Sequence, residues 1–363
     1  MGAEIARRTS ALKLGELLLL DARREPVERL GRELSAAGKP VDLTDPAETT
    51  HLLRGCDVVM NAAPYTENLL VMETALRAGC DYVDLGGLFH TTRRQLELDP
   101  RFAAEGLLAI LGMGKAPGIT NLLAASARER IPAVTRVLLR SGRKILSEES
   151  EIGIPYAPRT LLDEFTLKPV IVEDGVLVEK EPLSRQTVVD HPDPIGPLLY
   201  VTTLHSELAT LPAYLGVQLR SMEFQVALPN RTAVLLTELV RLGFADPKPV
   251  PGLTPSVSPR ELTVRLLEQV PVGIGPERWI TEVGVEGEKA GQAVRLVSRV
   301  SGNERQNGTA IAAVAALSLW ARGRLRTTGV KSPERSVPAD EFLEELTKTD
   351  LSLVLNEPVD AVA

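Results

Sequence analysis

Short apolar runs alternate with segments of helical periodicity along residues 2–113. "ELLLLD", "KPVDLTD", "DVVMNAAP", "DYVDLGG" and "LLAILGM" have the length and composition of strands. Between them, "EPVERLGRELSAAG" predicts a helix that ends at Gly38, "TENLLVMETALRAG" a helix from Thr66 to Gly79, and "TTRRQLELDPRFAAEG" a single further helix. Strands that are apolar on both faces and separated by helices are typical of a parallel sheet covered on both sides. The pattern therefore predicts a doubly wound, Rossmann-like α/β domain.

The chain opens on Gly2 and a helical segment. In Rossmann-like domains the first strand is central, and its turn into the first helix carries G-x-G-x-x-G, followed about 20 residues later by an acid that binds a ribose. Gly2 suits the last of these glycines, because Asp21 ends the next strand 19 positions later. The alternative is a surface helix followed by an acid at a strand end. We expect the central strand and the other two glycines to lie upstream of Met1, so that this domain is N-terminally truncated.

The residues after Asp21 bear on the choice of dinucleotide. A carboxylate here accepts hydrogen bonds from both ribose hydroxyls and repels a 2′-phosphate, which favours NAD. Arg23 and Arg24 could instead hold that phosphate, so NADP is the alternative. Small or polar residues near the strand ends are expected to line the same cofactor site: Ala22, Asp42, Leu43, Asn61, Ala62, Ala63, Pro64, Gly86 and Gly87. For Asp42 and Asn61 the alternative role is to cap a turn.

Strand-like segments take over from about residue 134. "VTRVLLRSG", "MEFQVAL" and the pair within "WITEVGVEGEKAGQAVRLVSRV" predict an antiparallel or mixed sheet, with "KAGQ" as a hairpin turn. "GTAIAAVAALSLWARGRL" predicts an apolar helix buried between domains or subunits. We therefore expect a dinucleotide-binding domain over residues 1–120, an α+β substrate and catalytic domain over 121–300, and a helical segment over 301–363 that returns to the first domain.

Composition narrows the class of protein. With 363 residues, 44% of them hydrophobic, and a net charge of -7 from interspersed acids and bases, the chain is expected to be a soluble globular protein without a nucleic-acid partner. The run "LLLL" is too short to span a membrane or to form a signal peptide. Two cysteines and four scattered histidines predict neither a disulfide framework nor a metal site. These features favour a cytoplasmic protein that binds a small molecule, and we expect its partners to be further copies of itself in a homo-oligomer.

One long stretch is more specific than any glycine pattern. "VVMNAAPYTENLLVMETALRAGCDYVDLGGLFHTTRRQLELD" resembles the saccharopine dehydrogenase family, as do "GKAPGITN", "TLLDEFTLKPVIVEDG" and "YVTTLHSELATLP". The "GLFH" and "TLHSE" stretches are most similar to the branch that contains L-lysine 6-dehydrogenase. The resemblance implies NAD(P)-dependent oxidation of a carbon that bears nitrogen, giving an imine that hydrolyses to a semialdehyde and ammonia. A saccharopine dehydrogenase or reductase and a carboxynorspermidine-type imine reductase are alternatives within the family, and a non-catalytic protein with a nucleotide-binding fold is an alternative outside it.

Amine oxidation requires a base, because the amine must be neutral before hydride leaves its carbon. His205 has the most suitable ordinary pKa, and Glu207 would face the same side if "YVTTLHSEL" were a strand. The alternative is a histidine that bonds the backbone at a strand end. Asp84 is expected to hold an ammonium or the nicotinamide carboxamide, or else to cap the turn that follows it.

Four further residues are expected to bind the substrate. Arg143, Tyr156 and Arg159 are candidates for a substrate carboxylate, because the planar arginine fork matches that group. His90 follows the glycines at a strand end and is expected to help close the pocket. Isolated arginines are more often solvated surface residues, which is the alternative for Arg143 and Arg159.

Overall fold

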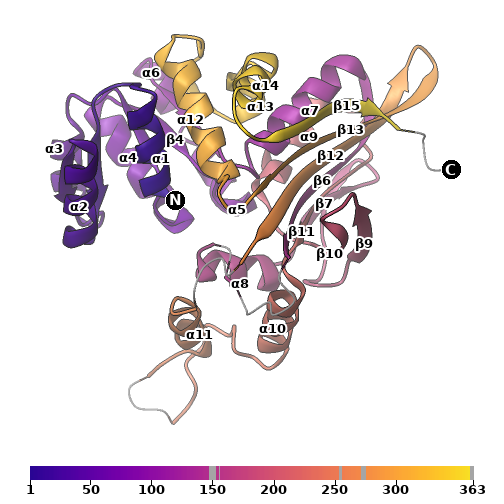
Figure 1. Cartoon of the computed structure of the whole chain (residues 1–363), viewed down its shortest axis with the longest axis horizontal. Coiled ribbons are helices and arrows are strands. Elements are labelled where there is room, and N and C mark those ends of the chain that lie inside the picture. The colour runs from indigo at the N-terminus through magenta and orange to yellow at the C-terminus, as the bar shows by residue number, and fades with distance from the viewer. Residues whose placement is uncertain (147–152, 155, 253–255, 271–274, 360–363) are drawn as a thin grey trace. The chain divides into compact units, whose positions relative to one another are not determined.

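The computed structural model describes residues 1–146, 153–154, 156–252, 256–270 and 275–359. The chain divides into two compact units, whose elements are labelled in Figure 1. Unit 1 comprises Met1–Arg130, Ala209–Leu215 and Asn307–Leu351, and unit 2 comprises Ile131–Leu208, Gly216–Gln306 and the residues from Ser352 onwards. Helix α7 (Ile119–Arg130) runs through residue 120, where the sequence suggested the end of the first domain.

Unit 1 alternates strands with helices, and its strands pair in parallel. The strands are β1 (Leu18–Asp21), β2 (Ala37–Pro40), β3 (Val58–Asn61), β4 (Asp81–Asp84), β5 (Leu108–Ile110) and β14 (Gly329–Lys331). The helices are α1 (Gly2–Ala11), α2 (Arg24–Leu34), α3 (Pro46–Leu53), α4 (Asn68–Ala78), α5 (Leu88–Leu96), α6 (Asp99–Ala104), α7, α9 (Leu211–Leu215), α12 (Gly308–Ala321), α13 (Pro333–Ser336) and α14 (Ala339–Thr347). This arrangement confirms the predicted Rossmann-like fold class.

The core of unit 1 lies between the β3–β4–β5–β14 sheet and the helices that cover it. Its buried side chains come from both kinds of element, and Met72, Tyr82 and Phe102 are fully inaccessible to solvent. Burying apolar side chains of this size stabilises the fold by roughly 1.5 to 3 kcal/mol each. The core therefore fixes the strand ends, and with them the loops that follow each strand.

The parallel strands of unit 1 fall into two separate sheets, with the orders β1–β2 and β14–β5–β4–β3. β5 is buried throughout, whereas the apolar side chains of β1 and β3 are only half-buried. α1 begins beside the carboxyl end of β3, because a Cβ atom built on Gly2 would lie 3.4 Å from the Cβ of Ala62. The strand expected ahead of Gly2 stays a prediction, and in a doubly wound sheet it would pair with both β1 and β3.

Several predicted boundaries in unit 1 are wrong, each for a local reason. Helix α2 ends at Leu34 because Ser35 adopts the left-handed conformation, and Gly38 lies in β2 instead, so the expected strand "KPVDLTD" is shifted toward the N-terminus. A 3-10 turn (Tyr65–Glu67) precedes α4, so Thr66 does not cap that helix, although Gly79 ends it in the left-handed conformation as predicted. The single helix expected after β4 is broken into α5 and α6.

The segment after residue 307 adds three helices and one strand to unit 1. Asn307 caps the apolar helix α12 by accepting a hydrogen bond from the backbone N–H of Ala310. Most side chains of α12 are buried, and the helix packs against α1 and α14, as Figure 1 shows for the two labelled neighbours. The tail behaves differently from the prediction, because β15 (Ser352–Pro358) pairs with a strand of unit 2.

Unit 2 is built on one mixed sheet, as the strand pattern predicts. The order along the sheet is β15–β13–β12–β6–β11–β10–β9, with β7 paired to β11 and β8 to β7. The strands are β6 (Ala133–Ile145), β7 (Val170–Glu173), β8 (Val176–Glu179), β9 (Gln186–His191), β10 (Gly196–Thr202), β11 (Ser221–Ala227), β12 (Glu277–Lys289) and β13 (Gln292–Asn303). β12 and β13 form the predicted hairpin, whose turn residues Ala290 and Gly291 have the positive φ angles that such a turn needs.

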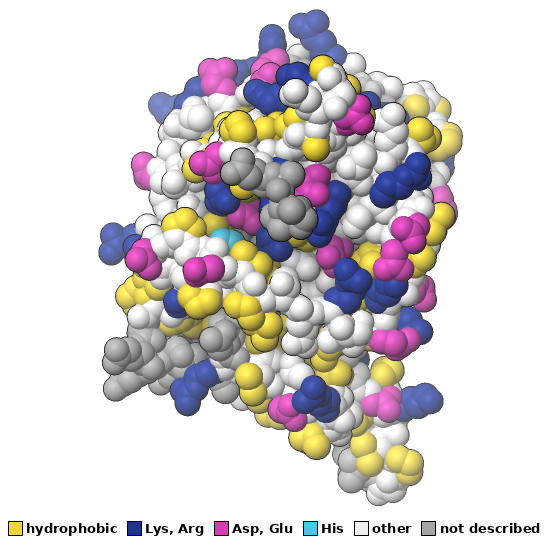
Figure 2. Space-filling view, turned by 90° about the vertical axis from the view of Figure 1, so that its right-hand side faces the viewer, with side chains coloured by type: hydrophobic (Ala, Val, Ile, Leu, Met, Phe, Trp, Pro, Cys, Tyr) yellow, Lys and Arg dark blue, Asp and Glu magenta, His cyan; other side chains and the backbone are white. Residues whose placement is uncertain are grey.

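In the described part of unit 2, three α-helices accompany this sheet, namely α8 (Pro158–Thr166), α10 (Asn230–Arg241) and α11 (Pro259–Leu267). α8 packs against both α10 and α11. Among the described residues, no helix is long and apolar enough to cross a bilayer. Basic and acidic side chains are interspersed over the face drawn in Figure 2, in keeping with the mixed charge of the sequence.

Candidate active site

Asp84 lies at the carboxyl end of β4 and is fully buried. Its carboxylate accepts five hydrogen bonds, and the donors are the backbone N–H groups of Gly86 and Gly112 and the side chains of Asn68, Tyr82 and Gln95. Burial raises the pKa of this carboxyl, while the bonds from Gln95 and Gly86 act in the opposite direction. Both oxygens are thus engaged within unit 1, which favours the turn-capping alternative over a direct catalytic role.

Asn61 belongs to the same internal network. Its side chain donates to Asn68 Oδ1 (2.9 Å) and to the Tyr82 hydroxyl (3.0 Å), and its Oδ1 accepts from the backbone N–H of Ala63. Asn61 is also buried. These contacts tie the end of β3 to the end of β4 and favour the capping alternative for Asn61.

Asp21 is arranged differently, at the carboxyl end of β1. Its Oδ1 accepts hydrogen bonds from the backbone N–H of Arg23 (2.9 Å) and from its Nε (3.2 Å). Its Oδ2 has no hydrogen-bond partner among the described residues, and 42% of the side chain is exposed. An exposed acceptor at the end of a parallel strand is what a ribose hydroxyl requires, so Asp21 fits the predicted cofactor role.

The other expected cofactor residues lie near the strand ends but differ in their exposure to solvent and in their local contacts. Ala62, Ala63 and Gly86 are half-buried, Gly87 is buried, and Ala22 and Pro64 are exposed. Asp42 accepts hydrogen bonds from the backbone and hydroxyl of Thr44, and these bonds lower its pKa. Leu43 packs against the core of unit 1. Capping and packing therefore account for Asp42 and Leu43.

His205 and Glu207 come together in unit 2. His205 Nδ1 makes a short hydrogen bond with Glu207 Oε2, and both residues are buried. The strand expectation is wrong: β10 ends at Thr202, and a 3-10 turn (Ser206–Ala209) sets the pair. The ring of His205 also stacks on Phe224 of β11, with centroids 3.6 Å apart. Burial lowers the pKa of His205, but the negative Glu207 outweighs this effect and raises it overall.

Tyr156 and Glu164 complete this cluster. Glu164 is carried by α8 and is only 6% exposed, and its Oε2 accepts a short hydrogen bond from the Tyr156 hydroxyl. Burial raises the pKa of Glu164 to about 7, although the nearby His205 opposes the rise. Tyr156 is 36% exposed as a residue, and its hydroxyl faces inward onto Glu164. A carboxyl that titrates near neutrality beside a charged imidazole is suited to proton transfer.

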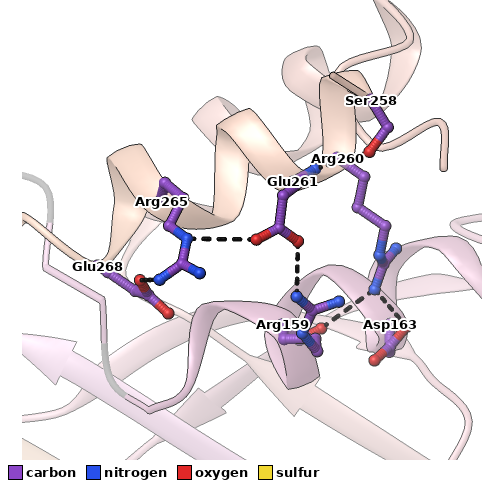
Figure 3. Close-up of polar contacts among 7 residues, drawn as sticks. All are labelled: Arg159, Asp163, Ser258, Arg260, Glu261, Arg265 and Glu268. Atoms are coloured by element: carbon purple, nitrogen blue, oxygen red, sulfur yellow. Dashed lines mark hydrogen bonds and ion pairs between the residues drawn. The ribbon is translucent and has the colours of Figure 1, made fainter. Parts of the chain in front are cut away.

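The two arginines predicted to bind substrate differ in their surroundings. Arg143 of β6 is 23% exposed, forms an ion pair with Glu277 (3.3 Å) and acts electrostatically on Tyr156. Arg159 of α8 pairs instead with Glu261 of α11 (2.8 Å), as Figure 3 shows. The neighbouring Arg260 of α11 pairs with Asp163 of α8, so that these contacts hold α8 against α11. Arg143 thus interacts with the cluster through Tyr156. Arg159 instead belongs to a partly exposed ion pair between two helices.

Two further outcomes concern His90 and Glu164. His90 is exposed at the start of α5, with its ring edge against Phe89. Glu164 was not predicted, although "TLLDEFTL" places two acids within an apolar helical segment, and such a pattern requires a partner for each acid. Among the described residues, no group of three or more His, Cys, Asp or Glu side chains is arranged to hold a metal ion.

Comparison with known proteins adds to this geometry. Residues 2–110 match the family model described as the saccharopine dehydrogenase NADP binding domain. Carboxyaminopropylagmatine dehydrogenase from Synechocystis sp. is 26% identical over 276 residues, which cover 69% of this chain and 68% of that protein. The apo structure of saccharopine dehydrogenase (L-Glu forming) from Saccharomyces cerevisiae has a TM-score of 0.74 at 15% identity and covers 98% of both chains.

Two of these comparisons carry the name saccharopine dehydrogenase, one for a domain of unit 1 and one for the fold of the whole chain. The matched domain spans the parallel strands β1 to β5 and includes Asp21, and the fold of the whole chain is that of the yeast enzyme. Residues 2–110 therefore form a dinucleotide-binding domain of the saccharopine dehydrogenase type, and the chain as a whole shares the fold of the yeast enzyme.

Proposed function

We propose that this protein uses a nicotinamide dinucleotide to oxidise a carbon–nitrogen bond of an amino acid or amine, in the manner of an L-lysine 6-dehydrogenase. The observation that carries the proposal is the cluster in unit 2 of the buried His205, Glu207 and Glu164 with the partly exposed Tyr156. Oxidation of an amine releases a proton as well as a hydride, and this cluster contains groups that can accept the proton. Unit 1 supplies the dinucleotide-binding domain.

In this reaction, unit 1 would bind the dinucleotide and the cluster in unit 2 would accept the proton of the amine. Asp21 would hold the adenosine ribose, and the first turn of α1 at Gly2 would bind the pyrophosphate through its unpaired backbone N–H groups. A nicotinamide dinucleotide, when bound, accepts the hydride from the substrate carbon. The cluster in unit 2 accepts the ammonium proton, which frees the nitrogen lone pair to form the C=N bond. Water then adds to that bond and ammonia leaves, giving an aldehyde.

A second candidate reaction rests on the cyanobacterial relative. Its name indicates a dehydrogenase of a carboxyaminopropyl derivative of agmatine. A related activity in this chain would join a carbonyl compound to an amine and reduce the imine, as a saccharopine reductase or carboxynorspermidine-type reductase does. The same acid–base cluster would then donate a proton to the imine nitrogen.

A substrate panel distinguishes these reactions. The protein is mixed with lysine, other diamino acids and polyamines, with NAD⁺ and NADP⁺ in turn, and formation of reduced dinucleotide is followed by absorbance. We expect turnover with lysine and a preference for NAD⁺. Turnover only in the reverse direction, with an amine, a carbonyl partner such as 2-oxoglutarate and reduced dinucleotide, would favour the second candidate.

Dinucleotide binding is measured separately by fluorescence of NADH and NADPH, with this chain and with a chain extended upstream of Met1. Failure of both chains to bind would favour a non-catalytic protein with a nucleotide-binding fold. We also expect a cytoplasmic homo-oligomer. Both of these stay predictions, and light scattering of the purified protein measures the oligomeric state.

A further inference from the structure

The charges around His205 do not suit a neutral histidine base. Its Nδ1 is bonded to Glu207, and Glu164 acts on the ring as a second negative neighbour. Phe224 covers one face of the ring. Two carboxylates beside one buried imidazole keep the imidazole protonated, because a buried negative charge needs a positive partner. A protonated histidine that is tied to Glu207 cannot accept the proton of an amine.

Glu164 is the member of the cluster that lacks such a firm partner. Among the described residues it accepts one hydrogen bond, from the Tyr156 hydroxyl, and α8 holds it at 6% exposure. By contrast, the neighbouring acid Asp163 is neutralised by Arg260 of α11. Tyr156, which is itself 36% exposed, joins the buried carboxylate to the protein surface.

We propose that Glu164 binds the ammonium group of the substrate and takes its proton, and that the His205–Glu207 pair acts as a positioning residue pair beside it. The substrate class is then an amine that is cationic at neutral pH. This inference rests on the proposed function, because it assigns one step of the same reaction.

The step is balanced without further reagents. An N–H bond of the ammonium breaks, its electron pair stays on nitrogen, and the proton forms an O–H bond with a Glu164 carboxylate oxygen. A dinucleotide held by unit 1 would supply the hydride acceptor, so that the freed pair would form the C=N bond. The proton of Glu164 returns to solvent after the product has left.

The charged groups near Glu164 set the direction of each test. His205 lowers the pKa of Glu164 and so does the Tyr156 hydrogen bond, whereas Asp163 and Glu207 raise it. Arg143 of β6 interacts with Tyr156. Replacing Tyr156 with Phe removes a donor to the ionised carboxylate, so the pKa of Glu164 is expected to rise.

The test compares Glu164→Gln, Glu164→Asp and Tyr156→Phe with the unmodified protein, using the best amine from the substrate panel. We expect Glu164→Gln to lower kcat/KM by about 10²- to 10⁴-fold with unchanged dinucleotide binding, and Glu164→Asp to restore part of it. In Tyr156→Phe the acidic limb of the pH profile of kcat/KM, with a midpoint near 7 in the unmodified protein, should move to higher pH. A matched alcohol should bind no better to the unmodified protein than to Glu164→Gln.

Glu282→Gln is the control for removing a buried carboxylate of unit 2. Glu282 pairs with Arg140 and Arg299 instead of the cluster, so its loss should change the melting temperature but leave the midpoint of the pH profile in place. An active protein whose kcat/KM survives Glu164→Gln within about threefold, or whose pH profile is unmoved in Tyr156→Phe, overturns the inference alone. A protein that binds dinucleotide but oxidises no amine overturns the proposed function, and the step assigned to Glu164 falls with it.

Discussion

Asp84 in unit 1 and Glu164 in unit 2 are both buried carboxylates, but their partners differ sharply. Asp84 accepts hydrogen bonds from five donors, whereas Glu164, within the part of the chain that the structure describes, accepts one, from a tyrosine hydroxyl. Many donors stabilise a buried negative charge and fix its position, whereas a poorly compensated charge is readily neutralised by a proton. Burial therefore identifies neither residue as functional by itself, and the number of donors separates a structural acid from a candidate proton acceptor.

The largest effect is expected on stability, at the buried Asp84 of unit 1. Asp84→Ala removes the acceptor of five buried donors, so we expect the free energy of unfolding to fall by on the order of 3 kcal/mol or more. Chemical denaturation followed by circular dichroism measures this loss. Asp42→Ala is the matched control, since Asp42 is an exposed acid that bonds only its own turn, and it should cost less than about 1 kcal/mol. Equal stability of the two variants would contradict the structural role of Asp84.

The next effect concerns the pH dependence of stability in unit 2. The pKa of Glu164 rises from its ordinary value of 4.5 to about 7 on folding, so the folded protein binds more protons than the unfolded chain between these values. The stability that Glu164 contributes is therefore present at low pH and is lost as pH rises through about 7, by on the order of 3 kcal/mol. The raised pKa of His205 acts in the same direction, above its ordinary value. Glu164→Gln should flatten this slope and be more stable than the unmodified protein at pH 8.

Glu282 gives the opposite sign and serves as the internal reference. Burial alone would raise the pKa of Glu282, but Arg299 and Arg140 hold that pKa below its ordinary value. The contribution of Glu282 to stability is therefore lost as pH falls. Glu282→Gln should therefore destabilise the protein at neutral pH. It should leave unchanged the slope of the free energy of unfolding against pH near neutrality. Unfolding curves at several pH values between 5 and 8 measure both variants. An unchanged slope in Glu164→Gln would refute the assignment of the neutral titration to Glu164.

Regular elements and polar networks were not equally predictable from the sequence. The alternation of apolar runs predicted the parallel strands and the β12–β13 hairpin, because burial on one or both faces leaves a periodic signal. Helix ends were less predictable, since Ser35 takes the left-handed conformation where Gly38 was expected to do so. The pairing of His205 with Glu207 was predicted for the wrong reason, because a 3-10 turn replaced the expected strand.

Contacts between distant segments were the least predictable part of the site. Glu164 interacts electrostatically with His205, which lies 41 positions further along the chain, and no spacing in the sequence encodes that approach. The same holds for Asp84, whose donor Gln95 lies on α5 and whose donor Gly112 follows β5. Sequence identified which residues could carry charge, and tertiary packing decided how each charge is compensated.

A moderate effect is expected at Asp21, whose side chain is 42% exposed, unlike the buried Asp84 and Glu164. Asp21→Asn keeps the side-chain shape but removes the charge that repels a 2′-phosphate. We expect NADH binding to weaken about tenfold and NADPH binding to weaken less or to improve. Fluorescence titration with both dinucleotides measures the ratio. Glu25→Gln, an exposed neighbour in α2, is the control, and equal effects of Asp21→Asn on both dinucleotides would argue against a ribose contact.

The smallest effect is expected at Arg159, whose ion pair with Glu261 leaves 43% and 42% of the two side chains exposed. Such pairs contribute about 0 to 1 kcal/mol, because water screens the charges and both side chains lose freedom. Arg159→Gln should therefore change the free energy of unfolding by less than about 1 kcal/mol and leave KM for the amine substrate unchanged. Arg143→Gln is the informative contrast, since Arg143 is more buried and adjoins the cluster through Tyr156. A rise in KM in Arg159→Gln without one in Arg143→Gln would contradict this prediction. It would indicate that Arg159, and not Arg143, contacts the substrate.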